Sequence, residues 1–135
     1  MSDDKSLRVQ IGVALEEYGA GVRQGLEEAL AGSMRRFVKA TRETAPVSSR
    51  RSGRFSGQKH LFETFASQRQ KSVLGSSSFL WFARRPGSRI LHLVEHGFIA
   101  RDGRFVNGAH FVRRALEQEE PKLMEAVEEV IRNGG

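Results

Sequence analysis

The feature that most constrains this chain is a long amphipathic segment, which predicts a helix from residue 14 to residue 44. Its apolar and small side chains recur at steps of three and four residues, which places them on one helix face. That face consists of Tyr18, Val22, Leu26, Ala29, Leu30, Ser33, Phe37 and Thr41. Pro46 ends the helix, because proline forces the residue before it out of helical geometry. Four glycines each weaken the helix by about 1 kcal/mol relative to alanine, so a packed partner is needed to hold it.

Length and composition indicate one soluble domain spanning residues 1–135. The chain has no cysteine, which excludes disulfides and thiolate metal sites and fits a reducing compartment. The longest apolar run, residues 79–83, is far shorter than the roughly 20 residues that span a bilayer. The first ten residues include Asp3 and Asp4 and lack the apolar core of a signal peptide. We therefore expect a protein made in the cytoplasm, without a membrane partner.

The net charge of +6 is unevenly distributed along the chain. Residues 1–34 contain three bases and six acids, whereas residues 35–94 contain thirteen bases and two acids. From residue 113 to the last residue the balance is acidic again, with four bases and six acids. A basic middle between acidic ends suits nucleic acid, and it equally suits head-to-tail contact with another copy. Charge alone does not decide between them.

The remaining patterns predict a small α+β domain. Apolar residues alternate in a strand at residues 6–12, and a sheet with a short helix is expected over residues 61–108. Within that region we expect a short helix or strand start at 61–65, a central strand at 76–84, a helix at 88–96, a turn at 101–104 and a strand at 105–106. Residues 47–60 form a long, flexible, basic loop. The sheet packs against the long N-terminal helix and a C-terminal helix.

The C-terminal helix is expected over residues 109–132. Its apolar stripe consists of Phe111, Val112, Ala115, Leu116, Leu123, Met124, Val127, Val130 and Ile131. Pro121 interrupts this pattern, so either the helix kinks there or a second helix begins with proline in its first turn.

One motif has the spacing of a zinc site. His92-Leu-Val-Glu95-His96 places two histidines four residues apart, with a glutamate that could act as general base, as in inverted zinc peptidases. The helix that would carry it is only about two turns long, and such enzymes need a third ligand from a downstream helix. We favour surface or interface histidines. Because no nucleophile elbow, phosphate loop or dinucleotide fingerprint is present either, we expect no enzyme, no metal and no cofactor.

Six basic residues are the candidate interaction residues: Arg50, Arg51, Arg54, Lys59, Arg84 and Arg85. The first four lie in the loop with Phe55 among them, which suits phosphate contacts and base stacking, or a loop that becomes ordered against a protein partner. Arg84 and Arg85 follow the aromatic run around Trp81, which we assign to the core.

The order of four short motifs resembles a known family. Thr44-Ala-Pro-Val47 follows the long helix, and Leu61-Phe-Glu-Thr-Phe65 follows the Ser/Arg/Gly loop. Leu93-Val-Glu-His-Gly97 and the helix opening Ala109-His-Phe-Val-Arg-Arg-Ala-Leu-Glu117 come next. Over residues 14–132 this order resembles the tail-completion, or head–tail joining, proteins of long-tailed double-stranded DNA bacteriophages. The chain departs from the family pattern at Ser52, usually threonine, at His96, often aromatic, and at Ala109-His110, where proline is usual.

The resemblance implies a non-enzymatic virion protein in the neck or tail. Relatives form rings, commonly of six subunits, that close the head-proximal end of the tail tube and join it to the neck. The implied partners are other copies of the chain, neck or stopper proteins and tail-tube proteins, with DNA passing through the lumen without specific binding. Another neck component (stopper or adaptor) or a minor capsid protein is the first alternative. A basic nucleic-acid-binding protein is the second.

A charge reversal tests the expected role of the loop. If residues 47–60 dock onto neck or tail-tube subunits, the triple variant Arg50→Glu, Arg51→Glu, Arg54→Glu blocks head–tail joining, because the reversed charges repel the docking surface. Infectious particles are counted in phage that carry the variant gene, and circular dichroism of the purified variant checks folding. Normal particle yield from a folded variant would rule out this role.

Overall fold

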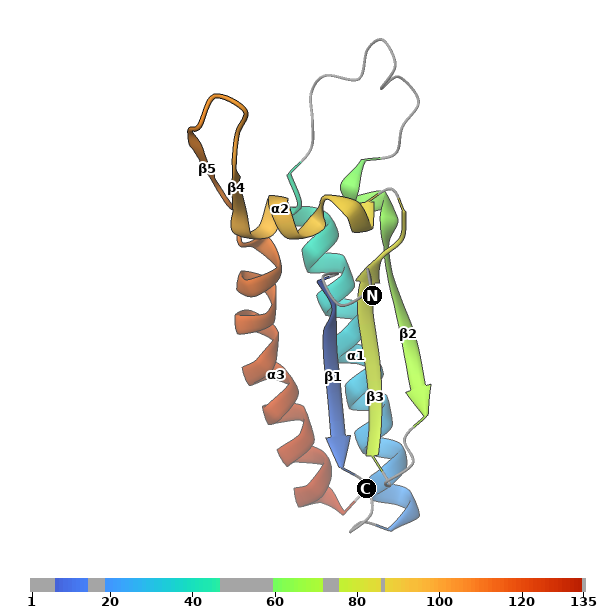
Figure 1. Ribbon diagram of the computed structural model, residues 1–135. Helices are drawn as coiled ribbons and strands as arrows, with labels where there is room; N and C mark the ends of the chain where they lie inside the picture. Colours follow the sequence, from blue (N-terminus) through green and yellow to red (C-terminus); the bar gives the residue numbers. More distant parts are fainter. Residues whose placement is uncertain (1–6, 15–18, 47–59, 72–75, 86, 135) are drawn as a thin grey trace.

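The computed structural model describes residues 7–14, 19–46, 60–71, 76–85 and 87–134. It has an α+β fold, as the sequence predicts. A three-stranded antiparallel sheet has the order β1-β3-β2 and is formed by β1 (Val9–Ala14), β2 (Phe65–Lys71) and β3 (Ser76–Ala83). Helix α1 (Ala20–Thr44) packs along one face of this sheet, and α3 (Phe111–Asn133) lies beside α1 (Figure 1).

Helix α1 buries most of the face that the sequence assigns to it. Its buried residues are Leu26, Leu30, Ser33, Met34, Phe37 and Thr41. The C-terminal end agrees with the prediction, since the N–H of Ala45 donates to the carbonyl of Thr41. The predicted start at residue 14 is wrong, because Ala14 pairs with Ser76 in the sheet and the helix begins after Gly19. Tyr18 lies outside the described residues.

The sheet differs from the prediction mainly in its two outer strands. β1 lies at residues 9–14 rather than 6–12, because the whole of β3 is available to pair with it as far as Ser76. β2 begins at Phe65 and continues through a largely polar segment that has no strand-like alternation. Its strand conformation depends on pairing with β3. The predicted central strand is correct except at its end, which is Ala83 rather than Arg84.

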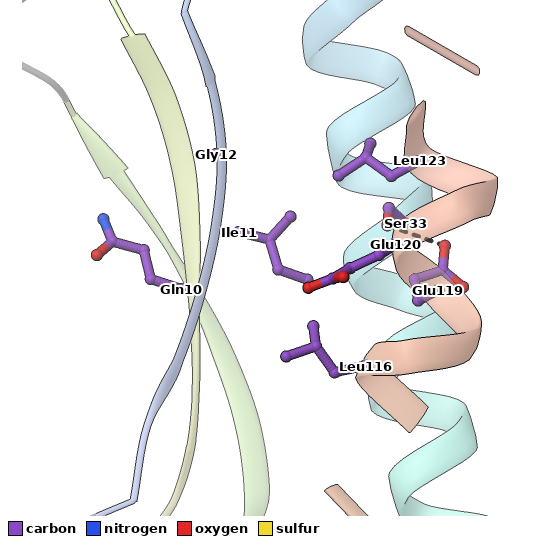
Figure 2. A pocket seen from close by; sticks show the side chains of 8 residues that line it. All are labelled: Gln10, Ile11, Gly12, Ser33, Leu116, Glu119, Glu120 and Leu123. Atoms are coloured by element: carbon purple, nitrogen blue, oxygen red, sulfur yellow. Dashed lines mark hydrogen bonds between the residues drawn. The ribbon is translucent and has the colours of Figure 1, made fainter. Parts of the chain in front are cut away.

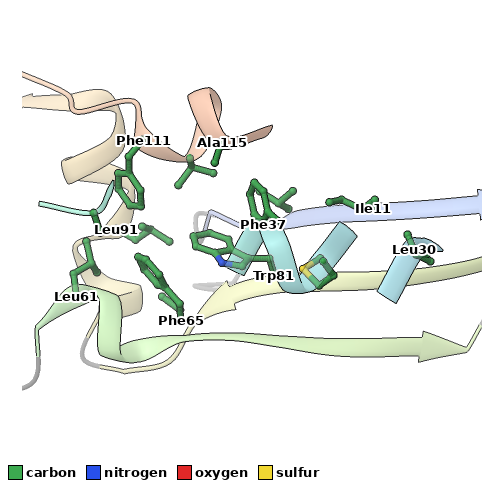
Figure 3. Packing of buried hydrophobic residues seen from close by; sticks show 14 residues of the cluster. Ile11, Leu30, Phe37, Leu61, Phe65, Trp81, Leu91, Phe111 and Ala115 are labelled. Atoms are coloured by element: carbon green, nitrogen blue, oxygen red, sulfur yellow. The ribbon is translucent and has the colours of Figure 1, made fainter. Parts of the chain in front are cut away.

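The core is built around Trp81, which is completely buried. The centroid of its ring lies 5.6 Å from the ring centroid of Phe37 of α1, in a T-shaped arrangement, and 4.9 Å from that of Phe65 of β2. Phe65 in turn stacks on Phe111 at 5.8 Å, so the cluster joins the sheet to both long helices (Figure 3). Such aromatic pairs stabilise by about 0.5 to 1.5 kcal/mol beyond their burial. The assignment of Trp81 to the core is confirmed.

Short elements cover one end of the sheet and lead into α3. The segment at Leu61 is both a helix and a strand start, since the 3₁₀ turn η3 (Leu61–Thr64) runs directly into β2. The helix predicted at 88–96 divides into the 3₁₀ turn η4 (Gly87–Arg89) and α2 (Leu91–His96).

A hairpin that the sequence indicated only in part follows α2. It consists of β4 (Gly97–Ile99) and β5 (Phe105–Asn107), and only the second strand and the turn were expected. Residues 47–59 of the predicted basic loop lie outside the described residues, and His60 precedes η3.

Helix α3 is continuous through Pro121, so no second helix begins there. It starts at residue 111, two residues later than expected, because His110 has a left-handed backbone (φ 53°) that cannot continue into the helix. Met124 and Ile131 were placed on the apolar stripe but are exposed to solvent, so the buried stripe is narrower than predicted.

Two glycines of α1 test its packing against α3. A Cβ added at Gly25 would lie 2.7 Å from Cγ1 of Val130, whereas one at Gly32 would meet only the tips of two arginines, at 3.5 Å and beyond. We expect Gly32→Ala to raise the free energy of unfolding by about 0.5 to 1 kcal/mol, through helix propensity. Gly25→Ala should lower it by about 1 to 2 kcal/mol, because the methyl group crowds α3. Urea denaturation measures both, and equal gains would contradict this close contact.

Candidate interaction surfaces

The buried carboxylate of Glu95 holds the start of α3. Its Oε1 accepts a hydrogen bond from the N–H of Val112 and its Oε2 one from the N–H of Arg113, each at 2.9 Å. These N–H groups have no partner within the helix, and the helix dipole favours a negative charge beside them. The carbonyl of Glu95 also accepts from the N–H of His110. Gly108 permits this close approach, since a Cβ there would lie 2.2 Å from that carbonyl oxygen.

This geometry gives the zinc-like motif a structural role. Both carboxylate oxygens of Glu95 are engaged by α3, and the residue is only 2% exposed. His92 is half-buried and His96 is exposed. Among the described residues, no group of three or more His, Cys, Asp or Glu side chains is arranged to hold a metal ion. The capping role could not be predicted from a local pattern, because it acts between residues 17 positions apart, in different elements.

A second buried carboxylate links α3 to α1. Oε1 of Glu119 accepts hydrogen bonds from Oγ of Ser33 and Nε of Arg36, both at 2.9 Å, and lies 2.7 Å from Nη2 of the same arginine. Ser33, the polar residue predicted on the buried face of α1, therefore has a hydrogen-bond partner for its hydroxyl group. The charge of Glu119 is compensated at a point where it would be costly to leave it unpaired.

A groove lies beside Glu119, between β1 and α3. We call it the β1–α3 groove; it has a volume of about 240 Å³ and is lined by Gln10, Ile11, Gly12, Ser33, Leu116, Glu119, Glu120 and Leu123. Figure 2 shows Ile11 and Leu116 pointing toward one another across it, with Glu120 between the strand and the helix. The groove therefore combines apolar walls with an acidic rim.

The structure describes two of the six predicted interaction residues and adds a third arginine. Arg84 and Arg85 line a pocket of about 280 Å³ together with Arg8, which comes from the segment before β1. All three are exposed, so the pocket presents a concentrated positive charge suited to a phosphate or a carboxylate. Arg8 was not among the predicted interaction residues, because its proximity to Arg84 and Arg85 depends on the pairing of β1 with β3. Arg50, Arg51, Arg54 and Lys59 lie outside the described residues.

The β4–β5 hairpin extends beyond α2, away from the sheet (Figure 1). Ile99 and Phe105 are paired across its two strands and are 73% and 59% exposed. Arg101 and Arg104 lie in the turn that joins the strands. A two-stranded hairpin is at best marginally stable alone in water, and exposed apolar pairs of this kind commonly mark a contact surface.

No protein family model matches this chain, and searches of curated proteins and of solved structures find no significant match. The resemblance to phage tail-completion proteins thus rests on the four motifs alone. In the described part of the chain, no helix is both long enough and apolar enough to cross a membrane.

Substitutions in the motif distinguish a cap from a catalytic base. We expect Glu95→Ala to lower the free energy of unfolding by about 2 to 4 kcal/mol, because two N–H groups at the start of α3 lose a charged partner. His92→Ala and His96→Ala should each change it by less than about 1 kcal/mol. Thermal and urea denaturation are measured with and without added zinc. Stabilisation by zinc that disappears in the histidine variants would contradict the structural role.

Proposed function

We propose that this chain is a structural subunit of a phage virion, forming a ring that completes the head-proximal end of the tail and joins it to the neck. The observation that carries the proposal is the order and spacing of the four motifs across residues 14–132. The fold is compatible with this proposal, because the described motif residues determine how the elements pack together rather than line a substrate site.

The described motif residues gather at one end of the molecule. Ala45 and Leu61 are buried in the same apolar cluster, and Phe65 stacks on Phe111. Glu95 joins α2 to the beginning of α3. The motifs therefore fix how the short elements and the hairpin are mounted on the long helices. A ring subunit depends on such a fixed shape, because its contacts must repeat around the ring.

The buried acidic groups support a non-enzymatic role. Glu95 and Glu119 are the carboxylates buried in the described core, and each is occupied by structural donors. A general acid or base must instead reach a substrate proton. We therefore propose no catalytic activity, and no metal or cofactor.

The basic pocket lined by Arg8, Arg84 and Arg85 is compatible with a second function, nucleic-acid binding. Arg8, Arg84 and Arg85 could contact DNA phosphates, either in the lumen of a ring or in a separate nucleic-acid-binding protein. Within the virion, a stopper, an adaptor or a minor capsid protein would use the same kinds of surface.

Self-association tests the ring proposal against DNA binding. We expect the molar mass from light scattering to rise with protein concentration toward a closed oligomer, visible as rings by negative-stain electron microscopy, with purified tail tubes promoting assembly. A nucleic-acid-binding protein would instead shift DNA at moderate salt, with affinity that falls steeply as salt rises. The Arg84→Glu, Arg85→Glu variant should abolish that shift. A chain that binds DNA in this way and never self-associates, even on tail tubes, would refute the ring.

A further inference from the structure

In the described part of the chain, the apolar side chains Ile99 and Phe105 of the hairpin are left exposed. Ile99 and Phe105 face each other across β4 and β5, so their exposed side chains form one apolar projection, here called the hairpin knob. Arg101 is exposed close by in the turn, while Asp102 is bonded to the N–H of Arg104. The hairpin thus offers an apolar centre beside a positive charge.

The β1–α3 groove has the complementary character. Its walls include Ile11, Leu116 and Leu123, and Glu120 is exposed at its rim. The part of α3 from Glu117 to Asn133 contains six acidic and two basic residues, so the negative charge continues along the helix. In the described part of the chain β1 pairs only with β3, which leaves its edge beside the groove unpaired. This surface therefore suits an apolar ligand with positive charge.

Figure 1 shows the hairpin on the opposite side of α2 from β1 and α3, the elements on either side of the groove, so the hairpin knob lies away from the groove of its own subunit. The hairpin extends past α2 in the direction away from the sheet (Figure 1), whereas the residues that line the groove come from β1, from Ser33 of α1 and from the stretch of α3 between Leu116 and Leu123. A contact between them must involve two copies. It uses different surfaces on each copy, and such head-to-tail contacts close into rings when the rotation between subunits allows it.

We propose that the hairpin knob of one subunit docks in the β1–α3 groove of the next copy, with Arg101 facing Glu120. This inference rests on the proposed ring for its biological setting and names the contact that builds it. Burial of Ile99 and Phe105 supplies apolar area, and the opposite charges set the direction and register of the contact.

A charge exchange tests the pairing with little risk to the fold, because both residues are exposed. Arg101→Glu and Glu120→Arg should each weaken self-association about tenfold or more, and mixing the two variants should restore it, because both contacts between unlike subunits then join opposite charges. The double variant should assemble nearly as well as the original chain. Glu125→Arg is the matched control: it is exposed on α3, about 140° around the helix from Glu120, and should have a much smaller effect. Loss of assembly without rescue would contradict the pairing.

Cross-linking provides an independent test, since the chain contains no cysteine. One subunit carries Ile99→Cys and the other Glu120→Cys, and they are mixed under mild oxidation at concentrations where the original chain assembles. We expect a disulfide-linked dimer from this mixture and much less from Ile99→Cys mixed with Glu125→Cys. Equal yields would overturn the proposed contact.

The outcomes separate this inference from the ring itself. Rings that persist in Arg101→Glu and in Ile99→Asp would overturn the hairpin contact and leave the ring proposal intact. Cross-linking of residue 99 to tail-tube or neck subunits, with none to Glu120→Cys, would assign the hairpin to a different partner and also overturn it. A chain that remains monomeric alone and with tail tubes, and gives no cross-link, would refute both proposals.

Discussion

The capping of α3 by Glu95 is the interaction on which the arrangement of this molecule most depends. It joins α2 to the first turn of α3 through a charged group buried at 2% exposure. The β4–β5 hairpin connects these two helices, so the contact of Glu95 with α3 also determines where the hairpin projects from the rest of the molecule. Phe111 and Val112 then enter the core in the same turn. A change in the cap would thus alter the core and the projecting surface together.

Sequence alone predicted the elements whose periodicity is strong. The buried face of α1 and the aromatic strand around Trp81 follow directly from the spacing of their apolar residues. The strand β2 was recognised only at its start, since the segment after Phe65 is polar and is formed by pairing with β3. The boundary near Ala14 was misplaced for a similar reason, because tertiary pairing extended a strand into a predicted helix. Local patterns could not show either effect.

The candidate surfaces were less accessible to prediction than the fold. Arg84 and Arg85 were singled out from their position after the aromatic strand, but the contribution of Arg8 requires the sheet register. The exposure of Ile99 could not be inferred, because an apolar residue in a short strand is usually expected to be buried. The capping role of Glu95 was not predicted, because the spacing of His92 and His96 beside it is typical of a metal site. Contacts between distant segments decide all three cases.

The fold also changes the meaning of the basic middle of the chain. The sequence left open whether its bases meet nucleic acid or the acidic ends of a neighbouring copy, and some of them instead meet those acids within one subunit. Arg36 binds Glu119, and Arg69 lies 2.8 Å from Glu27 on α1. The pair of Arg69 and Glu27 is partly exposed and contributes at most about 1 kcal/mol, whereas Arg36 compensates the buried carboxylate of Glu119.

Part of the charge asymmetry therefore stabilises the fold itself. Arg42 is likewise occupied, through a hydrogen bond to the carbonyl of Phe65. Among the exposed bases of the described residues, Arg8, Arg84 and Arg85 share one pocket and two more arginines lie in the hairpin turn, while exposed acidic residues lie along the second half of α3. Because these surfaces are separate and opposite in sign, they would favour a head-to-tail contact in the ring that we propose, whereas a symmetric dimer would not need two different surfaces.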